Sequence, residues 1–142
     1  MTACAASLLE GIPERLGLAA NTAWEEKGGA LWLALDPPQV RELATAMNEI
    51  RARFLTATAY QPAGPESAYI EYHWDCDGQL LGFRFPLPAR SIDSIYDLCE
   101  AADWIEREIH EGFAVDFVGR EYEPLELRQG DTLGVNLREE AK

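Results

Sequence analysis

Apolar and polar residues alternate with the period of a β-strand in several parts of the chain. The alternation in Ala30–Leu35 follows a glycine turn, Lys27-Gly28-Gly29, and together they predict a β-hairpin with Thr22–Glu26. Further strands are predicted at Phe54–Gln61, Ala68–Cys76, Gln79–Leu87 and Phe113–Gly119. Asp77-Gly78 joins two of these strands and is a strong hairpin signal, whereas Pro86 and Pro88 are expected to end the second one.

Three other segments carry apolar residues at helical spacing. Ala5–Leu16 is interrupted by Pro13, which is expected to break the helix or begin a second short turn. Asp36-Pro37-Pro38 is typical of a helix start, and the spacing predicts a helix over Val40–Phe54. The last predicted helix is Ala101–Gly112, ended by Gly112.

These elements predict an α+β fold with two layers: one mainly antiparallel mixed sheet with helices packed on one face. The 142 residues correspond to a single domain, 1–142. Residues 120–142 are polar and poorly periodic, so we expect an extended tail there.

Charge is the largest departure from average composition, with 25 acidic against 12 basic residues and a net charge of −13. Such a surface repels phosphate groups, which argues against nucleic acid and against direct contact with anionic lipid. Cys4, Cys76 and Cys99 are far apart and have none of the spacings of iron–sulfur or zinc sites. The longest apolar stretch, Ala30–Leu35, is too short to span a membrane, and Met1–Leu9 lacks the basic residues of a secretory signal. We therefore expect a cytoplasmic chain without metal.

Titratable residues offer little chemistry by themselves. His73 and Asp75 share one face of a predicted strand, where two ligands are too few for structural zinc, and a solvent-facing polar side explains them better. Glu106 and Glu108 point in different directions on a helix, so they do not form the carboxylate pair of a glycosidase. Glu108 is predicted to share the face of Trp104, Ile105 and Ile109, where its carboxylate needs a hydrogen-bonding partner or solvent. No active site is predicted.

The segment from Ala101 to Gly119 changes this interpretation. Its sequence A-A-D-W-I-E-R-E-I, followed by Phe113, Val115, Phe117 and Gly119 at alternate positions, resembles the signature of the respiratory complex I 30-kDa subunit family. Complex I is the respiratory NADH dehydrogenase, and this family also has relatives in energy-converting nickel–iron hydrogenases. The resemblance extends more thinly over about residues 12–139, including Ser94-Ile95-x-Asp97 and the closing Gly134-Val135-x-Leu137-Arg138.

The chain departs from the family signature at three places. Glu111 stands where the family has Asp, Ala114 replaces the Gly after Phe113, and Arg120-Glu121 replaces His-Pro or Asn-Pro. The following stretch, Arg-rich in the family, is acidic here.

The resemblance implies a scaffolding subunit without a redox centre or other cofactor. Its partners would be a hydrogenase-like large subunit and small iron–sulfur subunits, in the cytoplasmic arm of a complex on the inner face of the cell membrane. The residues that the resemblance assigns to packing or to the partner interface are Trp104, Glu106, Arg107, Glu108, Phe113, Phe117 and Gly119. We expect Trp104 and Phe113 mainly in the core, and Glu106 and Arg107 mainly available outward.

Within the scaffolding hypothesis, an NADH- or quinone-linked complex I and a membrane-bound hydrogenase remain open. Two other hypotheses compete with it. The acidity and the lost Gly and Pro positions suggest a stand-alone acidic interaction module with the same fold. Titratable groups alone suggest a small enzyme using His73, Asp75 or Glu108, which requires a closed, apolar-lined pocket that joins them.

Overall fold

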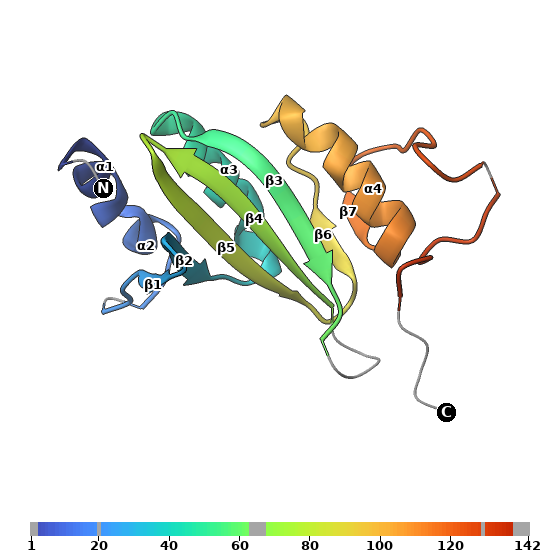
Figure 1. Ribbon diagram of the computed structural model, residues 1–142, viewed down its shortest axis with the longest axis horizontal. Helices are drawn as coiled ribbons and strands as arrows, with labels where there is room; N and C mark the ends of the chain where they lie inside the picture. The colour runs from blue at the N-terminus through green and yellow to red at the C-terminus, as the bar shows by residue number, and fades with distance from the viewer. Residues whose placement is uncertain (1–2, 20, 63–67, 129, 138–142) are drawn as a thin grey trace.

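The computed structural model describes residues 3–19, 21–62, 68–128 and 130–137; the Cys4 side chain and Arg138 lie outside this set (Figure 1). A five-stranded sheet forms the centre of the molecule. Neighbouring strands are antiparallel, except that β2 and β5 pair in parallel. The strand order is β1 (Glu25–Lys27), β2 (Ala30–Ala34), β5 (Gln79–Leu87), β4 (Ala68–Cys76), β3 (Arg53–Tyr60). The predicted mainly antiparallel mixed sheet is confirmed.

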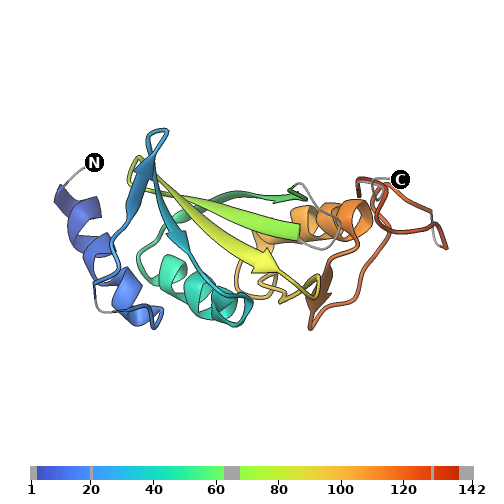
Figure 2. The ribbon, with the colours of Figure 1, turned by 90° about the horizontal axis from the view of Figure 1, so that it is seen from below.

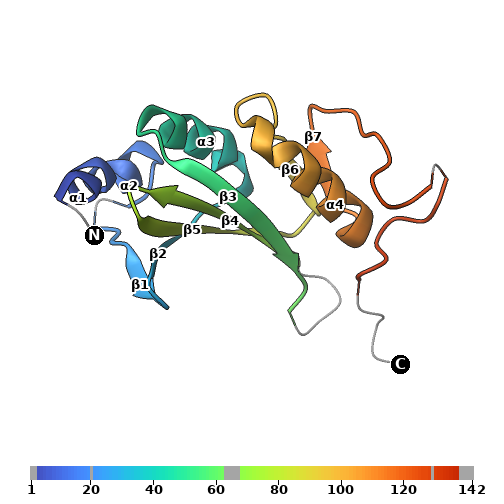
Figure 3. The same cartoon turned by 45° about the horizontal axis from the view of Figure 1, so that its top comes forward.

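The helices form a second layer. α3 (Val40–Glu49) follows the short 3-10 turn η1 (Pro37–Gln39) and lies beneath the sheet in Figure 2. α4 (Asp103–Phe113) follows the turn η2 (Glu100–Ala102) and packs against β3 (Figure 3). α1 (Ala3–Glu10) and α2 (Ile12–Arg15) lie beside β1 and β2, with Pro13 in the first turn of α2. In the described ranges, every helix is too short or too polar to cross a lipid bilayer.

The pattern of buried side chains along the strands shows which face of the sheet contacts the core. Along β4 buried and half-buried residues alternate at every position, and along β5 the buried side chains include Leu81, Phe83, Phe85 and Leu87. Asp77 and Gly78 have φ of +51° and +87°, the backbone of a tight two-residue hairpin turn whose twist matches the flanking strands. No described helix lies over the opposite face of the sheet (Figure 2), where Trp32 and His73 meet edge to face.

One predicted helix boundary was wrong, and the predicted end of one strand, at Leu87, was confirmed. The helix predicted to reach Phe54 ends at Glu49, because the left-handed conformation of Arg51 (φ +57°) turns the chain into β3. β5 continues through Pro86 to Leu87. Its pairing with β2 ends at Arg84, so the missing N–H of Pro86 removes no hydrogen bond to β2.

The chain after α4 folds back onto the helix. α4 ends at Phe113, with Ala114 as its cap, and not at Gly112, and β7 (Asp116–Val118) then pairs in parallel with β6 (Ser91–Asp93). Residues 120–128 and 130–137 form neither helix nor strand. The N–H of Asn136 donates to the carbonyl of Gly112 at 2.7 Å, and a Cβ at Gly112 would lie 2.7 Å from Asn136 Nδ2. Gly112 therefore permits the close approach of the tail.

Ala114 caps α4 in a left-handed conformation (φ +54°, ψ +36°) that glycine adopts without strain. Ala114→Gly is expected to stabilise the fold by about 1 kcal/mol, measured by urea unfolding, because a left-handed L-residue costs roughly 1–2 kcal/mol. Ala101→Gly is the control. It lies in η2 with a negative φ and should lose about 0.5–1 kcal/mol. Equal destabilisation by both substitutions would contradict this account of the cap.

Candidate interaction site around helix α4

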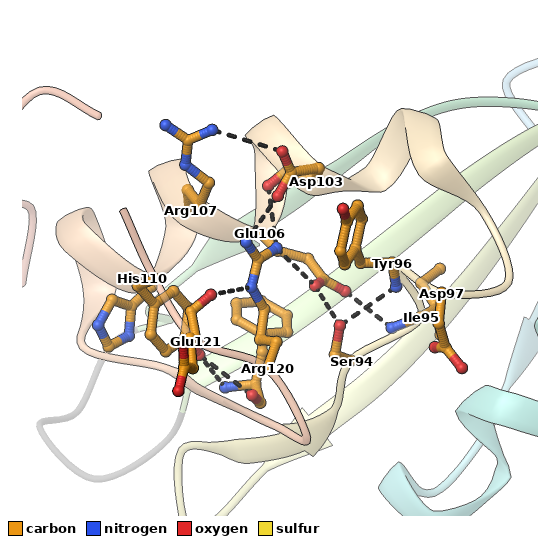
Figure 4. Close-up of polar contacts among 12 residues, drawn as sticks. Ser94, Ile95, Tyr96, Asp97, Asp103, Glu106, Arg107, His110, Arg120 and Glu121 are labelled. Atoms are coloured by element: carbon orange, nitrogen blue, oxygen red, sulfur yellow. Dashed lines mark hydrogen bonds and ion pairs between the residues drawn. The ribbon is translucent and has the colours of Figure 1, made fainter. Parts of the chain in front are cut away.

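The carboxylate of Glu106 is buried on the inner face of α4, with 1% of the residue exposed. Its Oε1 accepts a hydrogen bond from Ser94 Oγ at 2.6 Å, and its Oε2 accepts one from the backbone N–H of Ile95 at 2.9 Å. Arg120 Nη1 approaches Oε1 at 3.2 Å (Figure 4). A buried carboxylate needs such donors, and here they come from the segment after β6 and the segment after β7.

Arg120 joins the two carboxylates of α4 that lie nearest to it. Its Nη2 bonds Asp103 Oδ1 at 2.6 Å, and its guanidinium lies 5.0 Å from the ring centre of Tyr96 and 5.2 Å from that of Tyr122. Only 7% of the Arg120 side chain is exposed. The guanidinium thus satisfies Glu106 and Asp103 while its faces lie near two aromatic rings, an arrangement that suits arginine and not lysine.

Burial and hydrogen bonding have opposite effects on the pKa values of Glu106 and Arg120. Burial raises the pKa of the Glu106 carboxyl above its ordinary value of 4.5, although hydrogen bonds from Ser94, Ile95 and Arg120 counteract part of the rise. Burial also acts to lower the pKa of Arg120, but hydrogen bonds to Asp103 and Glu106 reverse this and raise it, so the cation is retained. The charge of Arg120 therefore stabilises an acid that would otherwise favour its neutral form.

Aromatic stacking fixes the chain beyond β7. The rings of His110 and Tyr122 stack with centres 3.6 Å apart, and His110 Nδ1 lies 2.8 Å from the carbonyl oxygen of Val115. The Tyr122 hydroxyl accepts a hydrogen bond from the N–H of Phe117 at 2.5 Å. Burial raises the pKa of Tyr122 to about 12, so the hydroxyl stays protonated at neutral pH.

Glu111 holds a second part of the tail. Its carboxylate accepts backbone N–H bonds from Leu125, Glu126 and Leu127, each at 2.8 Å, and 7% of the residue is exposed. Burial acts to raise its pKa, but the three N–H donors outweigh burial and lower the pKa below 4.5. The Glu111 carboxylate therefore anchors residues 125–127 to α4.

Three residues of α4 lie on sides opposite to those predicted. Trp104, expected in the core, is 67% exposed, and Glu106, expected outward, is buried. The Arg107 side chain, also expected outward, is 12% exposed and bonds Asp103 at 3.4 Å, one helical turn earlier. Glu108 lies in solvent. The physical reason is that donors from Ser94, Ile95 and Arg120 allow the helix to bury its acid.

The remaining predicted site residues have structural positions. Phe117 is completely buried in β7, and Phe113 is half-buried against the core. Gly119 is exposed with φ +94°, which lets the chain turn after β7. α4 and β7 thus bring the predicted residues into one region, where Trp104 and Glu108 are exposed.

The groove beside His73 does not join the three residues of the enzyme hypothesis. His73 lies on the open face of the sheet in a groove of about 620 Å³, which is not lined by Asp75 or Glu108. Asp75 bonds the N–H of Gly78, and Glu108 lies on the outer face of α4. Burial lowers the pKa of His73, partly opposed by Glu71. Across the described residues, no group of three His, Cys, Asp or Glu is placed to hold a metal ion.

Sequence reasoning missed Arg120 and Ser94 as parts of the site. In the sequence, Arg120 stands out only as a departure from the family signature and Ser94 only as a match to it. One signal in the sequence could have linked both residues to Glu106. Glu106 is an acid on a helical face whose other positions are apolar: Ala102, Ile109 and Phe113. Such an acid requires donors from elsewhere in the chain.

Comparison with known proteins agrees with this architecture. No curated protein matches the sequence. A trypsin-resistant fragment of Nqo5 is similar in structure, with a TM-score of 0.65 and 23% identity, over 82% of this chain and 99% of that one. A chain of the membrane-bound sulfane sulfur reductase, an archaeal respiratory membrane complex, has a TM-score of 0.70 and 19% identity, over 90% of this chain and 80% of that one. At these identities the likeness shows the fold.

Family membership rests on sequence. The family described as respiratory-chain NADH dehydrogenase, 30 Kd subunit, matches residues 33–141. The match runs from β2 through the rest of the sheet to α4 and the tail that covers it. The chain therefore belongs to the 30-kDa subunit family of respiratory-chain NADH dehydrogenase, which indicates a subunit of a complex I-like respiratory assembly.

Proposed function

We propose that this chain is a scaffolding subunit, without a redox centre of its own, of a complex I-like NADH/quinone oxidoreductase or a membrane-bound energy-converting hydrogenase. It docks the hydrogenase-like large subunit and the small iron–sulfur subunits of that complex. The observation that carries the proposal is the family match over residues 33–141, which includes α4 and its surroundings.

The geometry of α4 supports a structural role for the signature. Glu106 and Arg107 direct their charges inside the molecule, to Ser94, Arg120, Asp103 and backbone carbonyls. Groups used in this way fix the position of a helix and of the tail across it. A rigid helix with a defined outer face is what a docking subunit needs.

The proposed location is peripheral, on the inner face of the cell membrane, through partner subunits. A net charge of −13 opposes adsorption to anionic lipid, so association through protein is the favoured route.

Purification of the tagged full chain from native membranes tests the proposal. The hydrogenase-like large subunit and iron–sulfur subunits are expected in the eluate by mass spectrometry, and the type of large subunit distinguishes complex I from hydrogenase. A tagged acidic protein of similar size is the control for charge. If the chain is instead monomeric, absent from the membrane fraction and free of such subunits, the scaffolding proposal fails and the stand-alone module takes its place.

A further inference from the structure

The outer face of α4 presents an aromatic ring between two acids. Trp104 is 67% exposed, and Glu100 and Glu108 lie four residues before and after it, both exposed. Glu108 lies one α-helical turn after Trp104 and so adjoins it, whereas Glu100 lies in the turn η2 that leads into α4; these three exposed residues are called the α4 stripe. The two acids alone would make this surface soluble, so solubility does not explain why a large aromatic side chain is exposed between them.

The indole is held in place and is not loosely attached. The Arg107 guanidinium lies 5.4 Å from the Trp104 ring centre, and it also bonds Asp103 and the backbone carbonyls of Glu123 and Pro124. These contacts tie Arg107 to the tail, and Arg107 in turn covers one side of the ring. A pre-ordered aromatic side chain loses little entropy on binding, which is how tryptophan acts as an anchor at interfaces.

The charge around this stripe is one-sided. Residues 100–128 contain nine acidic and three basic side chains, an excess of six acids. Two of the three bases, Arg107 and Arg120, are engaged with Asp103 and Glu106. In the described ranges neither Glu100 nor Glu108 forms an ion pair, so both charges remain available to a partner.

The open face of the sheet is a weaker candidate. Its groove of about 620 Å³ also has exposed apolar side chains, Leu55 and Leu80. However, its charges have both signs, and Arg84 is already paired with Glu71 at 3.1 Å. The mixed charges of that face therefore do not favour one kind of partner, whereas the acids of the α4 stripe favour a basic one.

We propose that the stripe Glu100–Trp104–Glu108 docks a basic surface of a partner subunit, which has an apolar pocket for the indole and Lys or Arg side chains at its rim. The inference rests on the proposed scaffolding function and specifies the chemistry of its partner. Buried aromatic anchors supply most of the affinity of such interfaces, and rim charges supply orientation and speed of association.

The test uses membranes from cells that lack the native chain, to which purified full-length protein is added. Trp104→Ala is expected to weaken binding by at least about 30-fold, as loss of an anchor does. Glu100→Lys with Glu108→Lys is expected to weaken it by about tenfold at low salt, and by much less at about 0.5 M NaCl, where screening shortens the reach of charges. The matched controls are Leu80→Ala on the open sheet face and Glu10→Lys with Glu26→Lys near α1 and β1; both should bind as the wild type does.

The outcomes separate the two proposals. If the wild-type chain fails to bind, the scaffolding function itself fails. If the wild type binds and Trp104→Ala binds equally well with an unchanged melting temperature, only the docking stripe is overturned. Equal weakening by the control charge reversals would also overturn it, because the effect would then belong to net charge.

A photoreactive phenylalanine derivative placed at position 104 identifies what the stripe contacts. The cross-linked peptide is expected from a subunit of the complex, with Lys or Arg beside the attachment site. Attachment to lipid, to an acidic peptide or to a second copy of this chain would contradict the proposal.

Discussion

Replacing Arg120 with alanine is expected to destabilise the fold by about 3–5 kcal/mol at neutral pH, because it leaves a buried carboxylate without its counter-charge. Glu106 is 1% exposed and would keep only the hydrogen bonds from Ser94 and Ile95. Asp103 would retain Arg107, but at the longer distance of 3.4 Å.

The size of this effect should depend on pH in a defined direction. Burial already raises the pKa of Glu106 above 4.5 in the folded protein, and loss of Arg120 raises it further. At a pH between the two pKa values, Glu106 is protonated in the folded variant and ionised in the unfolded chain. Its stability is therefore retained at low pH and lost as pH rises from 4.5 through the folded pKa. We expect the difference from wild type to be smaller near pH 5 than near pH 8.

Urea unfolding at these two pH values measures the effect. Arg53→Ala is the control: this arginine is 75% exposed and lies 3.7 Å from Asp75, so its loss should cost under about 0.5 kcal/mol. Adding Glu106→Gln to Arg120→Ala should recover part of the stability and remove the dependence on pH, since the charge that needed Arg120 is gone. A cost for Arg120→Ala that stays below about 1 kcal/mol at both pH values would refute the account.

Replacing Glu111 with alanine is expected to release the tail from α4, with a loss of about 2–3 kcal/mol. Three backbone N–H groups lose a charged acceptor at once. The net contribution of one hydrogen bond to a charged group is about 1.5–3 kcal/mol, and the released tail recovers part of the loss by bonding to water. Limited proteolysis should then cut near Arg128 much faster than in the wild type, and urea unfolding gives the loss of stability.

The contribution of Glu111 to the stability of the fold should be lost in acid. Its folded pKa is lowered, so its contribution is complete above the ordinary value of 4.5 and is lost as pH falls through the folded pKa. The difference between wild type and Glu111→Gln should therefore shrink below about pH 4.5. Glu108→Ala is the control, since that side chain is exposed on the same helix and should change neither proteolysis nor stability by more than about 0.5 kcal/mol. Unchanged cleavage in Glu111→Ala would show that other contacts hold the tail.

The sheet could be predicted from sequence because its signals are local. The alternation of β4, the apolar residues of β5 and the Asp77-Gly78 turn all act within a few residues, and the structure confirms both strands and the turn. The parallel pairing of β2 with β5 could not be predicted in this way, because it depends on how distant segments meet.

The orientation of α4 could not be predicted because it depends on distant polar partners. A helical pattern with Trp104, Ile105 and Ile109 on one side is a reasonable core face when a buried acid is assumed to be unfavourable. Ser94 and Arg120, which make that burial possible, lie 12 and 14 residues from Glu106 in sequence. Periodicity contains no information about such contacts.

Two of the departures from the family signature now have structural interpretations. Ala114 occupies a left-handed position where glycine is the easier residue. Arg120, where the signature has His or Asn, joins Glu106 to Asp103. One departure introduces strain and the other adds an ion-pair network at the same end of the fold.

The parallel pairing of β2 with β5 has a consequence for synthesis on the ribosome. Ala30 pairs with Leu80, fifty positions later in the chain. At about 5–20 residues per second, the first hairpin is made roughly 3–10 s before the strand that completes it. During that time Leu33, which the finished sheet and helices bury, has no β5 to pack beside. The nascent hairpin thus exposes an unpaired strand edge to chaperones until β5 is made.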